Sequence, residues 1–179
     1  MKQLTNTILS VTLLTTLAFA QPGAAPVTEP SPIRNIDEYD LGKKNLGIDG
    51  YDPVAYFPEG GSKPTKGKKD ITLEHKGVLY RFASEANRDQ FKSDPAKYEP
   101  AYGGWCAWAM LEGDKTEIDP KTFIVKDGRL FLFYNGFFGN TKKDWLKGDH
   151  DEQADRSDTE WNKLSGESPR VAPKPVPEP

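Results

Sequence analysis

The sequence has a single cysteine, Cys106, and two histidines, His75 and His150, among 179 residues. One cysteine excludes an intrachain disulfide scaffold and any zinc module built from cysteine clusters. The charge is nearly balanced, with 24 basic and 27 acidic residues and a formal net charge of −3. This mild acidity offers no basic surface to nucleic acid, so we expect no nucleic-acid partner.

Long hydrophobic runs are also missing, because no internal stretch approaches the roughly 20 apolar residues that span a bilayer. A short apolar stretch, residues 8–19, follows Lys2 and ends in the small-x-small pattern Ala18-Phe19-Ala20. This pattern is typical of a cleavable signal peptide, and a membrane anchor is the less favoured alternative because the stretch is short. We therefore predict a signal peptide over residues 1–20. The mature protein is then periplasmic or secreted and has no transmembrane segment.

Large apolar side chains are scarce at both edges of the remaining chain. Residues 21–32 are rich in proline, glycine and alanine, and residues 165–179 end in alternating prolines. Such segments bury too little surface to fold, so we predict a disordered leader and an extended, disordered Pro-rich tail. The folded domain is expected over residues 33–164, and most of the aromatic residues lie within it.

Two pairs of apolar runs predict β-hairpins. Residues 71–75 and 78–82 alternate apolar and polar side chains on either side of Lys76-Gly77. Residues 122–125 and 130–134 flank Asp127-Gly128. Period-two alternation around a glycine-containing turn is typical of a hairpin.

Capping residues predict the helices. Ser84 precedes a helical segment, Asp94-Pro95 repeats the signal, Asn140 can begin a third helix, and Gly166 follows the charged segment 151–164. We also expect a short strand over residues 54–57, a short helix over 105–110, and a lead-in outside the core over 37–49. The predicted fold class is α+β, with two short hairpins and packed helices.

Three motifs in order resemble the YHS domain over residues 51–98. They are Asp52-Pro53-Val54, then Gly77-x-x-Tyr80-x-Phe82-x-Ser84, then Phe91-x-x-x-Pro95-x-x-Tyr98. The later stretch Tyr102-Gly103-Gly104-Trp105-Cys106-Ala107 and the Trp145 region resemble an exported subgroup of YHS-containing proteins. The resemblance implies a small treble-clef-like α+β domain of a family that is often associated with metal handling.

The chain departs from that family at the metal-binding positions. Where metal-handling members carry three cysteines, this sequence has Ala55, Ala83 and Asn87. Thiolates select copper(I) and zinc, whereas alanine offers no ligand and asparagine only a weak, neutral one. The resemblance therefore implies the fold without the usual metal site, although the histidine of the motif is present as His75.

A rebuilt copper or zinc site would have to use His75 and Cys106. A blue-copper arrangement would need His150 and Met110 as well, and the spacing of such sites is missing. The alternatives give both residues a purely structural role. His75 is then a strand residue whose ring is hydrogen-bonded within the fold, and Cys106 is an unreactive residue of the core. His150 would then be an exposed residue whose aspartate neighbours favour its protonated form. We expect no bound cofactor.

The sequence favours a non-enzymatic exported binding or accessory module. Its expected surface joins the Asp52 segment, His75 and the Tyr102–Cys106 segment beside an aromatic-lined cleft, with Asp52, Tyr102, Gly104 and Trp105 as candidate ligand-binding residues. The expected partner is an unidentified small ligand or a periplasmic protein. Two alternatives stay open. One is a metal-handling protein that uses His75 and Cys106, and the other is a thiol-dependent enzyme.

Overall fold

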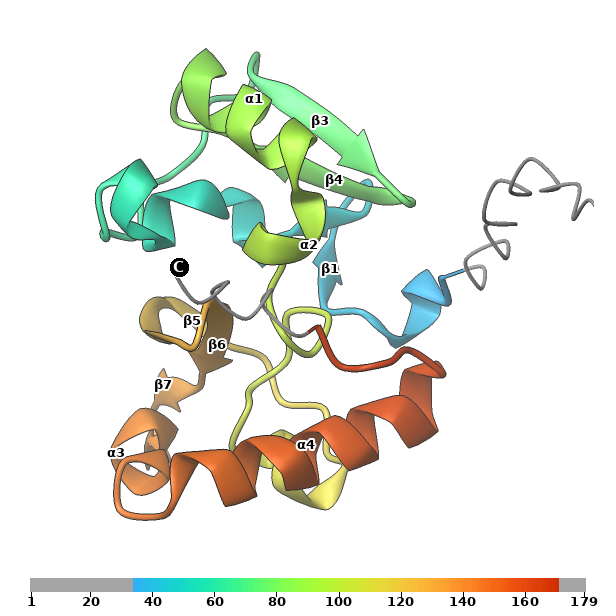
Figure 1. Ribbon diagram of the computed structural model, residues 1–179, viewed down its shortest axis with the longest axis vertical. Coiled ribbons are helices and arrows are strands. Elements are labelled where there is room, and N and C mark those ends of the chain that lie inside the picture. Colours follow the sequence, from blue (N-terminus) through green and yellow to red (C-terminus); the bar gives the residue numbers. More distant parts are fainter. Residues whose placement is uncertain (1–33, 171–179) are drawn as a thin grey trace, which may run out of the picture. The chain divides into compact units, whose positions relative to one another are not determined.

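The computed structural model describes residues 34–170. The predicted signal peptide, the predicted leader and residues 171–179 of the predicted tail lie outside the described residues. Figure 1 shows two groups of elements, one formed by residues 34–98 and one by residues 105–165, joined by the segment after α2. We call them the N-terminal group and the C-terminal group.

The N-terminal group is built on a four-stranded sheet in the order β1-β2-β4-β3. The strands are β1 (Leu41–Gly42), β2 (Leu46–Gly47), β3 (Thr72–His75) and β4 (Val78–Arg81). β3 and β4 form the hairpin that Lys76-Gly77 predicts, and β2 pairs with β4 in parallel. The sheet therefore mixes orientations, because the lead-in adds two strands, β1 and β2, to the β4 edge of the predicted hairpin.

The helices of this group begin where the capping residues predict. The Ser84 hydroxyl accepts a hydrogen bond from the Asn87 backbone N–H at the start of α1 (Glu85–Ser93), and Asp94 caps α2 (Pro95–Tyr98). The 3₁₀ helices among the described residues are η1 (Ile36–Glu38), η2 (Ile48–Gly50), η3 (Val54–Tyr56), η4 (Pro58–Gly60) and η5 (Ala109–Glu112).

Three local predictions were wrong. Residues 54–56 form η3 instead of a strand, because Pro53 has helical backbone angles and Asp52 caps the Val54 N–H. Residues 102–105 are turns, so the expected helix over 105–110 is replaced by η5. The lead-in is part of the core, since Tyr39 and Ile48 are buried.

The C-terminal group contains the second predicted hairpin, β5 (Asp119–Lys126) with β6 (Arg129–Phe133), which turns at Asp127-Gly128 as expected. A smaller hairpin, β7 (Asn135–Gly136) with β8 (Gly139–Asn140), follows it. α3 (Thr141–Trp145) and α4 (His150–Ser165) complete the group, and α4 packs against η5. The predicted α+β class with two hairpins and packed helices is confirmed. The treble-clef arrangement stays a prediction.

Aromatic rings fill both groups. Phe91 lies within 4.8 Å of Tyr80 and 5.3 Å of Phe82 by ring centroids, and Trp145 lies 5.8 Å from Phe131. Such pairs bury large apolar areas and stabilise the packing beyond area alone. Among residues 34–170, no helix is both long enough and apolar enough to cross a membrane.

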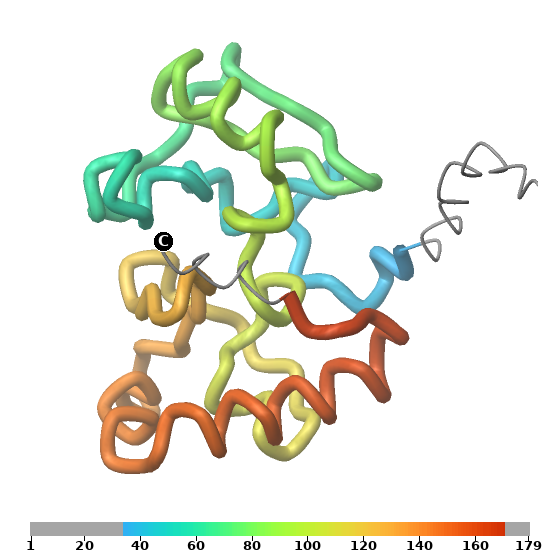
Figure 2. Tube along the Cα trace, viewed as in Figure 1, coloured from blue at the N-terminus to red at the C-terminus, as the bar shows by residue number. Residues whose placement is uncertain are grey.

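The ordered chain continues past the boundary expected at residue 164. Ser165 belongs to α4, and residues 166–170 turn back over the junction between the two groups (Figure 2). There Arg170 donates a hydrogen bond to the Pro100 carbonyl oxygen. The proline pattern predicts an extended segment, but it does not reveal that Glu167 and Arg170 attach it to the domain.

Candidate functional site

Asp52 occupies the centre of the YHS-like motif and is fully buried. Its Oδ1 accepts a hydrogen bond from Val54 N at 2.9 Å, and its Oδ2 accepts from Ala83 N at 2.8 Å and Asn87 Nδ2 at 2.7 Å. The resemblance places thiols at positions 83 and 87. Here Ala83 and Asn87 donate hydrogen bonds to the Asp52 carboxylate instead. Asp52 joins η3, β4 and α1, and it presents no oxygen to a ligand.

The Tyr102–Trp105 segment is a tight backbone passage. Gly103 has a φ of +60°, and a Cβ there would lie 2.7 Å from the Trp161 ring. Gly104 has a φ of +102°, and a Cβ there would lie 3.3 Å from Asp40. Both positions therefore require glycine for packing as well as for conformation. The glycine pair brings the backbone close to α4 and the lead-in rather than to an open site.

The two other candidates in this segment have separate partners. Tyr102 is buried, and its hydroxyl donates to the Ala154 carbonyl of α4 at 3.4 Å. Trp105 is half-buried, and its indole N–H donates to the Glu38 carbonyl at 2.6 Å. Among the described residues, no hydrogen bond connects this segment to Asp52. None of the four candidate ligand-binding residues lines either of the two grooves found among the described residues.

Asp40 lies against the glycine pair, and no sequence motif singled out its carboxyl group. Its backbone N–H donates to Gly103 O at 3.0 Å. Burial raises the pKa of its carboxyl to about 6, and the negative charges of Asp49 and Glu117 add to the effect. No local pattern distinguishes Asp40 from the other acidic residues of the lead-in.

His75 lies at the end of β3, where its ring packs edge-on against Phe91 with 6.0 Å between centroids. Burial lowers the pKa of the imidazole, and the positive charges of Arg34 and Lys76 act in the same direction while Glu99 opposes them. His75 is therefore a half-buried, mainly neutral strand residue. No described hydrogen bond connects it with Cys106.

Cys106 is fully buried and belongs to a closed ring of hydrogen bonds. Tyr134 N donates to Sγ at 3.3 Å, Sγ lies 3.3 Å from Thr141 Oγ1, and Thr141 Oγ1 donates to Tyr134 O at 3.1 Å. Because the threonine proton is used on the carbonyl, the thiol proton is the donor to Oγ1. The ring thus connects Cys106 with the end of β6 and the start of α3.

The described residues bring together one set of three possible metal ligands, and it excludes both predicted ones. Atoms of Asp127, His150 and Asp151 lie within 4.8 Å of one another. The Trp145 indole N–H donates to His150 Nδ1 at 2.9 Å, and an indole can only donate. The neutral ring therefore carries its proton on Nε2, so neither nitrogen has a free lone pair for a metal.

Charge at the same cluster also opposes a metal. Lys126 Nζ lies 3.0 Å from Asp127 and 3.8 Å from Asp151, so an ammonium group already pairs with both carboxylates and offsets half of their negative charge. Burial lowers the pKa of His150, and Lys126 reinforces the shift. The expectation of a protonated, exposed His150 was wrong, because its ring packs between Phe131 and Trp145.

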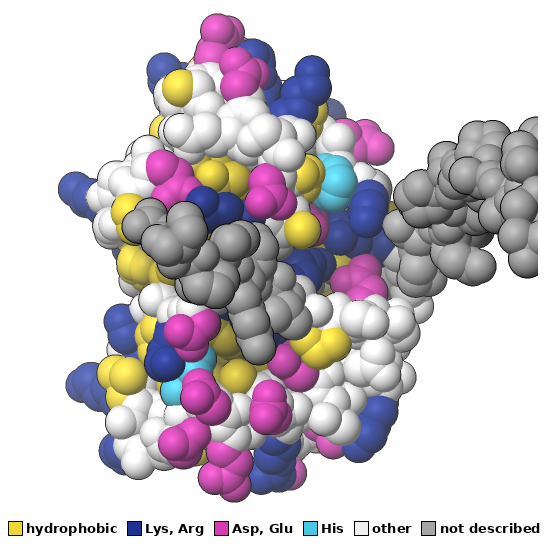
Figure 3. Space-filling model, in the orientation of Figure 1, with side chains coloured by type: hydrophobic (Ala, Val, Ile, Leu, Met, Phe, Trp, Pro, Cys, Tyr) yellow, Lys and Arg dark blue, Asp and Glu magenta, His cyan; other side chains and the backbone are white. Residues whose placement is uncertain are grey.

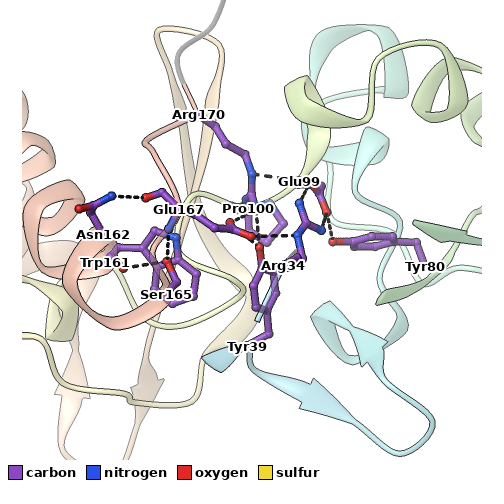
Figure 4. Close-up of polar contacts among 10 residues, drawn as sticks. All are labelled: Arg34, Tyr39, Tyr80, Glu99, Pro100, Trp161, Asn162, Ser165, Glu167 and Arg170. Carbon is purple, nitrogen blue, oxygen red and sulfur yellow. Dashed lines mark hydrogen bonds and ion pairs between the residues drawn. The ribbon is translucent and has the colours of Figure 1, made fainter. Parts of the chain in front are cut away.

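A buried ionic cluster closes the junction between the two groups (Figure 4). Arg34 donates to both oxygens of Glu99, at 2.6 and 2.9 Å, and Tyr80 donates to Glu99 Oε1 at 2.8 Å. Arg170 lies 3.6 Å from Glu99 on its other side. Despite burial, these two cations hold the pKa of Glu99 below its usual value. Every oxygen of this carboxylate is therefore used within the fold.

The cluster extends to Glu167, which accepts from Tyr39 Oη at 2.6 Å and from Arg34 at 3.0 Å. Arg170 also donates to Tyr39 Oη at 2.8 Å. These contacts join the lead-in to the segment after α4. They account for the ordered chain beyond residue 164, and the separation of the partners in sequence explains why no motif revealed them.

A groove of about 450 Å³ opens beside η5 and the start of α4. Trp108, which is 37% exposed, and Leu111 supply its apolar surface. The other residues that line it are Gly148 and the polar residues Asp144, Lys147, Asp149, Glu152, Gln153 and Arg156. The groove has a single aromatic residue and does not include Asp52, so it is a different opening from the aromatic-lined cleft expected beside Asp52. It is formed by residues more than thirty positions apart.

Both basic side chains of the groove form ion pairs, but one of its acidic side chains does not. Lys147 pairs with Asp144 at 2.7 Å, and Arg156 pairs with Glu112 outside the groove. Asp149 caps α4 by accepting from two backbone N–H groups. Glu152 makes no ion pair with any described residue. The groove therefore combines an exposed indole with an uncompensated carboxylate.

Comparison with known proteins identifies no relative: no protein family, curated protein or solved structure matches this chain. The likeness to the YHS domain therefore depends on the quoted motifs alone and stays a prediction. The function is therefore inferred from the geometry of the described residues.

Proposed function

We propose that this protein is an exported, non-enzymatic binding module with a YHS-like fold, and that its ligand site is the groove at Trp108. The observation that carries the proposal is the contrast between Trp108 and the reactive side chains. Trp108 is 37% exposed over an open groove, whereas Asp52 and Cys106 are fully buried. A residue that must reach a substrate cannot have all of its polar atoms used by the fold.

The chemistry of the groove favours a cationic group on an apolar body. An indole face attracts a cation through its quadrupole, most strongly when a carboxylate lies nearby. Glu152 supplies an unpaired negative charge, and both basic residues of the groove are already paired. A quaternary ammonium compound or a basic side chain of a protein partner has this combination of properties.

The experiment compares choline with 3,3-dimethylbutanol, its neutral isostere, by isothermal titration calorimetry. We expect choline to bind about fivefold more tightly, because a cation–π contact at a partly exposed site contributes about 1 kcal/mol. Trp108→Ala should abolish the preference for the cation, and Glu152→Gln should reduce it.

The matched control is Leu146→Ala, which shortens a side chain that is 63% exposed and does not line the groove. It should leave both affinities unchanged. Equal affinity for choline and its isostere, or choline binding that survives Trp108→Ala, would refute the assignment of this groove.

A further inference from the structure

The β7–β8 hairpin carries the two most exposed large hydrophobic side chains of the described chain. Phe137 is 95% exposed and Phe138 is 89% exposed, and they occupy the turn between Gly136 and Gly139. Two-residue hairpin turns favour glycine and asparagine, and phenylalanine gains nothing from the turn itself. Folding therefore gives no reason for two adjacent phenylalanines here.

The tip of the hairpin is held in place by polar contacts behind it. Phe138 N donates to the Tyr134 hydroxyl at 3.2 Å, and Asn135 Nδ2 donates to Asp119 Oδ2 at 3.1 Å. Thr141 N donates to Tyr134 O at 3.1 Å where α3 begins. The two rings are thus presented on a supported turn, and they pack edge-to-face against each other with 5.3 Å between centroids.

Three lysines lie on the elements next to this tip, although the whole chain is acidic; the Lys142 ammonium lies 5.7 Å from the Phe123 ring centroid. Lys142 and Lys143 directly follow β8, and Lys121 lies on β5 beside the Asp119 that holds Asn135. None of these three lysines forms an ion pair with any described residue. At the β7 and α3 end of the molecule, Figure 3 shows hydrophobic side chains at the surface next to lysine and arginine side chains.

We propose that the aromatic tip, Phe137 and Phe138 with Lys121, Lys142 and Lys143, docks this protein onto an anionic phospholipid surface. The phenylalanine rings enter the boundary between headgroups and acyl chains, and the ammonium groups contact lipid phosphates. Lysine stems suit this role because they extend along apolar surface and keep their charge in the polar layer. The attachment is peripheral, through a turn.

A lipid surface fits the tip better than a protein partner does. Protein interfaces favour tyrosine, tryptophan and arginine in their cores and are depleted of lysine, whereas this surface has only phenylalanine and lysine. A narrow turn with two crossed rings also offers little flat area for a complementary protein face. The proposal is independent of the Trp108 groove, which is lined by other residues.

The test is sedimentation of the full chain with vesicles of phosphatidylcholine alone or with 30% phosphatidylglycerol. We expect binding to the anionic vesicles that weakens as salt is raised. Phe137→Ser with Phe138→Ser should lower the partition coefficient at least about tenfold, and replacement by leucine at both positions should restore most of the binding. All variants share residues 1–33, so any contribution of that segment is common to them.

Lysine variants separate the charge contribution from the apolar one. Lys142→Ser with Lys143→Ser should reduce binding to anionic vesicles about fivefold for each lysine at low salt. The control pair Lys68→Ser with Lys69→Ser removes the same charge from an exposed loop of the N-terminal group and should have no effect. Because all four positions are partly or fully exposed, the fold should be retained.

Three results would overturn the proposal. They are no binding of the wild-type chain to anionic vesicles, binding that the double serine variant at Phe137 and Phe138 retains, and equal losses from the two lysine pairs. A wild-type dimer that dissociates in the serine variant, without vesicle binding, would instead assign the tip to contact between copies of the chain.

Discussion

The indole N–H of Trp145 donates to Nδ1 of His150 across 2.9 Å, and this bond determines the protonation of the ring. Protonation of Nδ1 or metal binding at either nitrogen requires the bond to break. His150 is thereby a structural partner of the Trp145 ring. It connects the end of α3 with the start of α4, where the groove lies.

This bond leads to a prediction about metal. We expect less than about one tenth of an equivalent of copper or zinc in the protein after exposure to either metal and dialysis, because the neutral ring has no free lone pair. Elemental analysis provides the measurement. Near one metal per chain, lost in His150→Gln or in Cys106→Ala, would show that a site exists and identify its ligand.

The thiol of Cys106 should be unreactive in the folded protein. Because it is buried and donates within a closed ring, we expect alkylation at neutral pH to be slower than in the unfolded chain by about a hundredfold or more. Cys106→Ala removes two hydrogen bonds and should lower the free energy of unfolding by about 1–2 kcal/mol. Cys106→Ser, the matched variant, keeps a donor and an acceptor and should lose less. Labelling at the rate of a free thiol would support an enzyme that uses it.

Asp40 gives the stability a distinct pH dependence. Its folded-state pKa, about 6, lies above the ordinary value, so the folded protein holds this proton more tightly than the unfolded chain does. The resulting stabilisation is present below the ordinary aspartate pKa and is lost as pH rises through about 6. We therefore expect Asp40→Asn to raise the free energy of unfolding by about 1–2 kcal/mol at pH 7 and to change it little at pH 3.5.

Chemical denaturation at the two pH values measures this effect. Asp37→Asn is the control, because it removes the same charge from a residue that is exposed on η1. A benefit of Asp40→Asn that is the same at both pH values would mean that the substitution acts through packing instead of charge.

The Glu99 carboxylate should give the stability of the protein the opposite pH dependence. Its lowered pKa means that the stability it gives is present above the ordinary glutamate pKa and is lost as pH falls through the lowered value. Glu99→Gln removes the most buried carboxylate of the cluster and leaves Arg34 and Arg170 to share Glu167, so we expect a loss of about 3 kcal/mol at pH 7. Glu112→Gln, which breaks the exposed pair with Arg156, should cost about 0.5 kcal/mol or less. Similar losses in the two variants would contradict the structural role of Glu99.

Local patterns predicted the parts of the fold that local physics determines. Both hairpins form where period-two alternation meets Lys76-Gly77 and Asp127-Gly128, and Ser84 and Asp94 begin helices as expected. Asp52, which precedes a proline, turns the backbone locally by accepting from Val54 N. Short runs such as residues 54–57 were misread because a buried carboxylate, contributed from outside the run, determines their conformation.

The functional surfaces depend on contacts that no local pattern contains. The groove joins Trp108 to side chains near Glu152, and the ionic cluster joins Arg34, Glu99 and Arg170. Trp108 lies within residues 105–110, for which the sequence predicted only a short helix, so nothing in the local pattern indicated that its ring is exposed. The exposure of Phe137 and Phe138 was equally invisible, because an apolar pair beside glycines predicts neither burial nor exposure.

The central claim is that the ligand site is the Trp108 groove rather than the Asp52 motif. The most direct test is a two-dimensional NMR titration of the labelled protein with choline, following all indole and backbone N–H signals. The account predicts shifts at Trp108, Leu111 and residues 148–152, with the Asp52 and Ala83 signals unmoved. Shifts centred on residues 52, 83 and 87, or no saturable shift near Trp108, would contradict it.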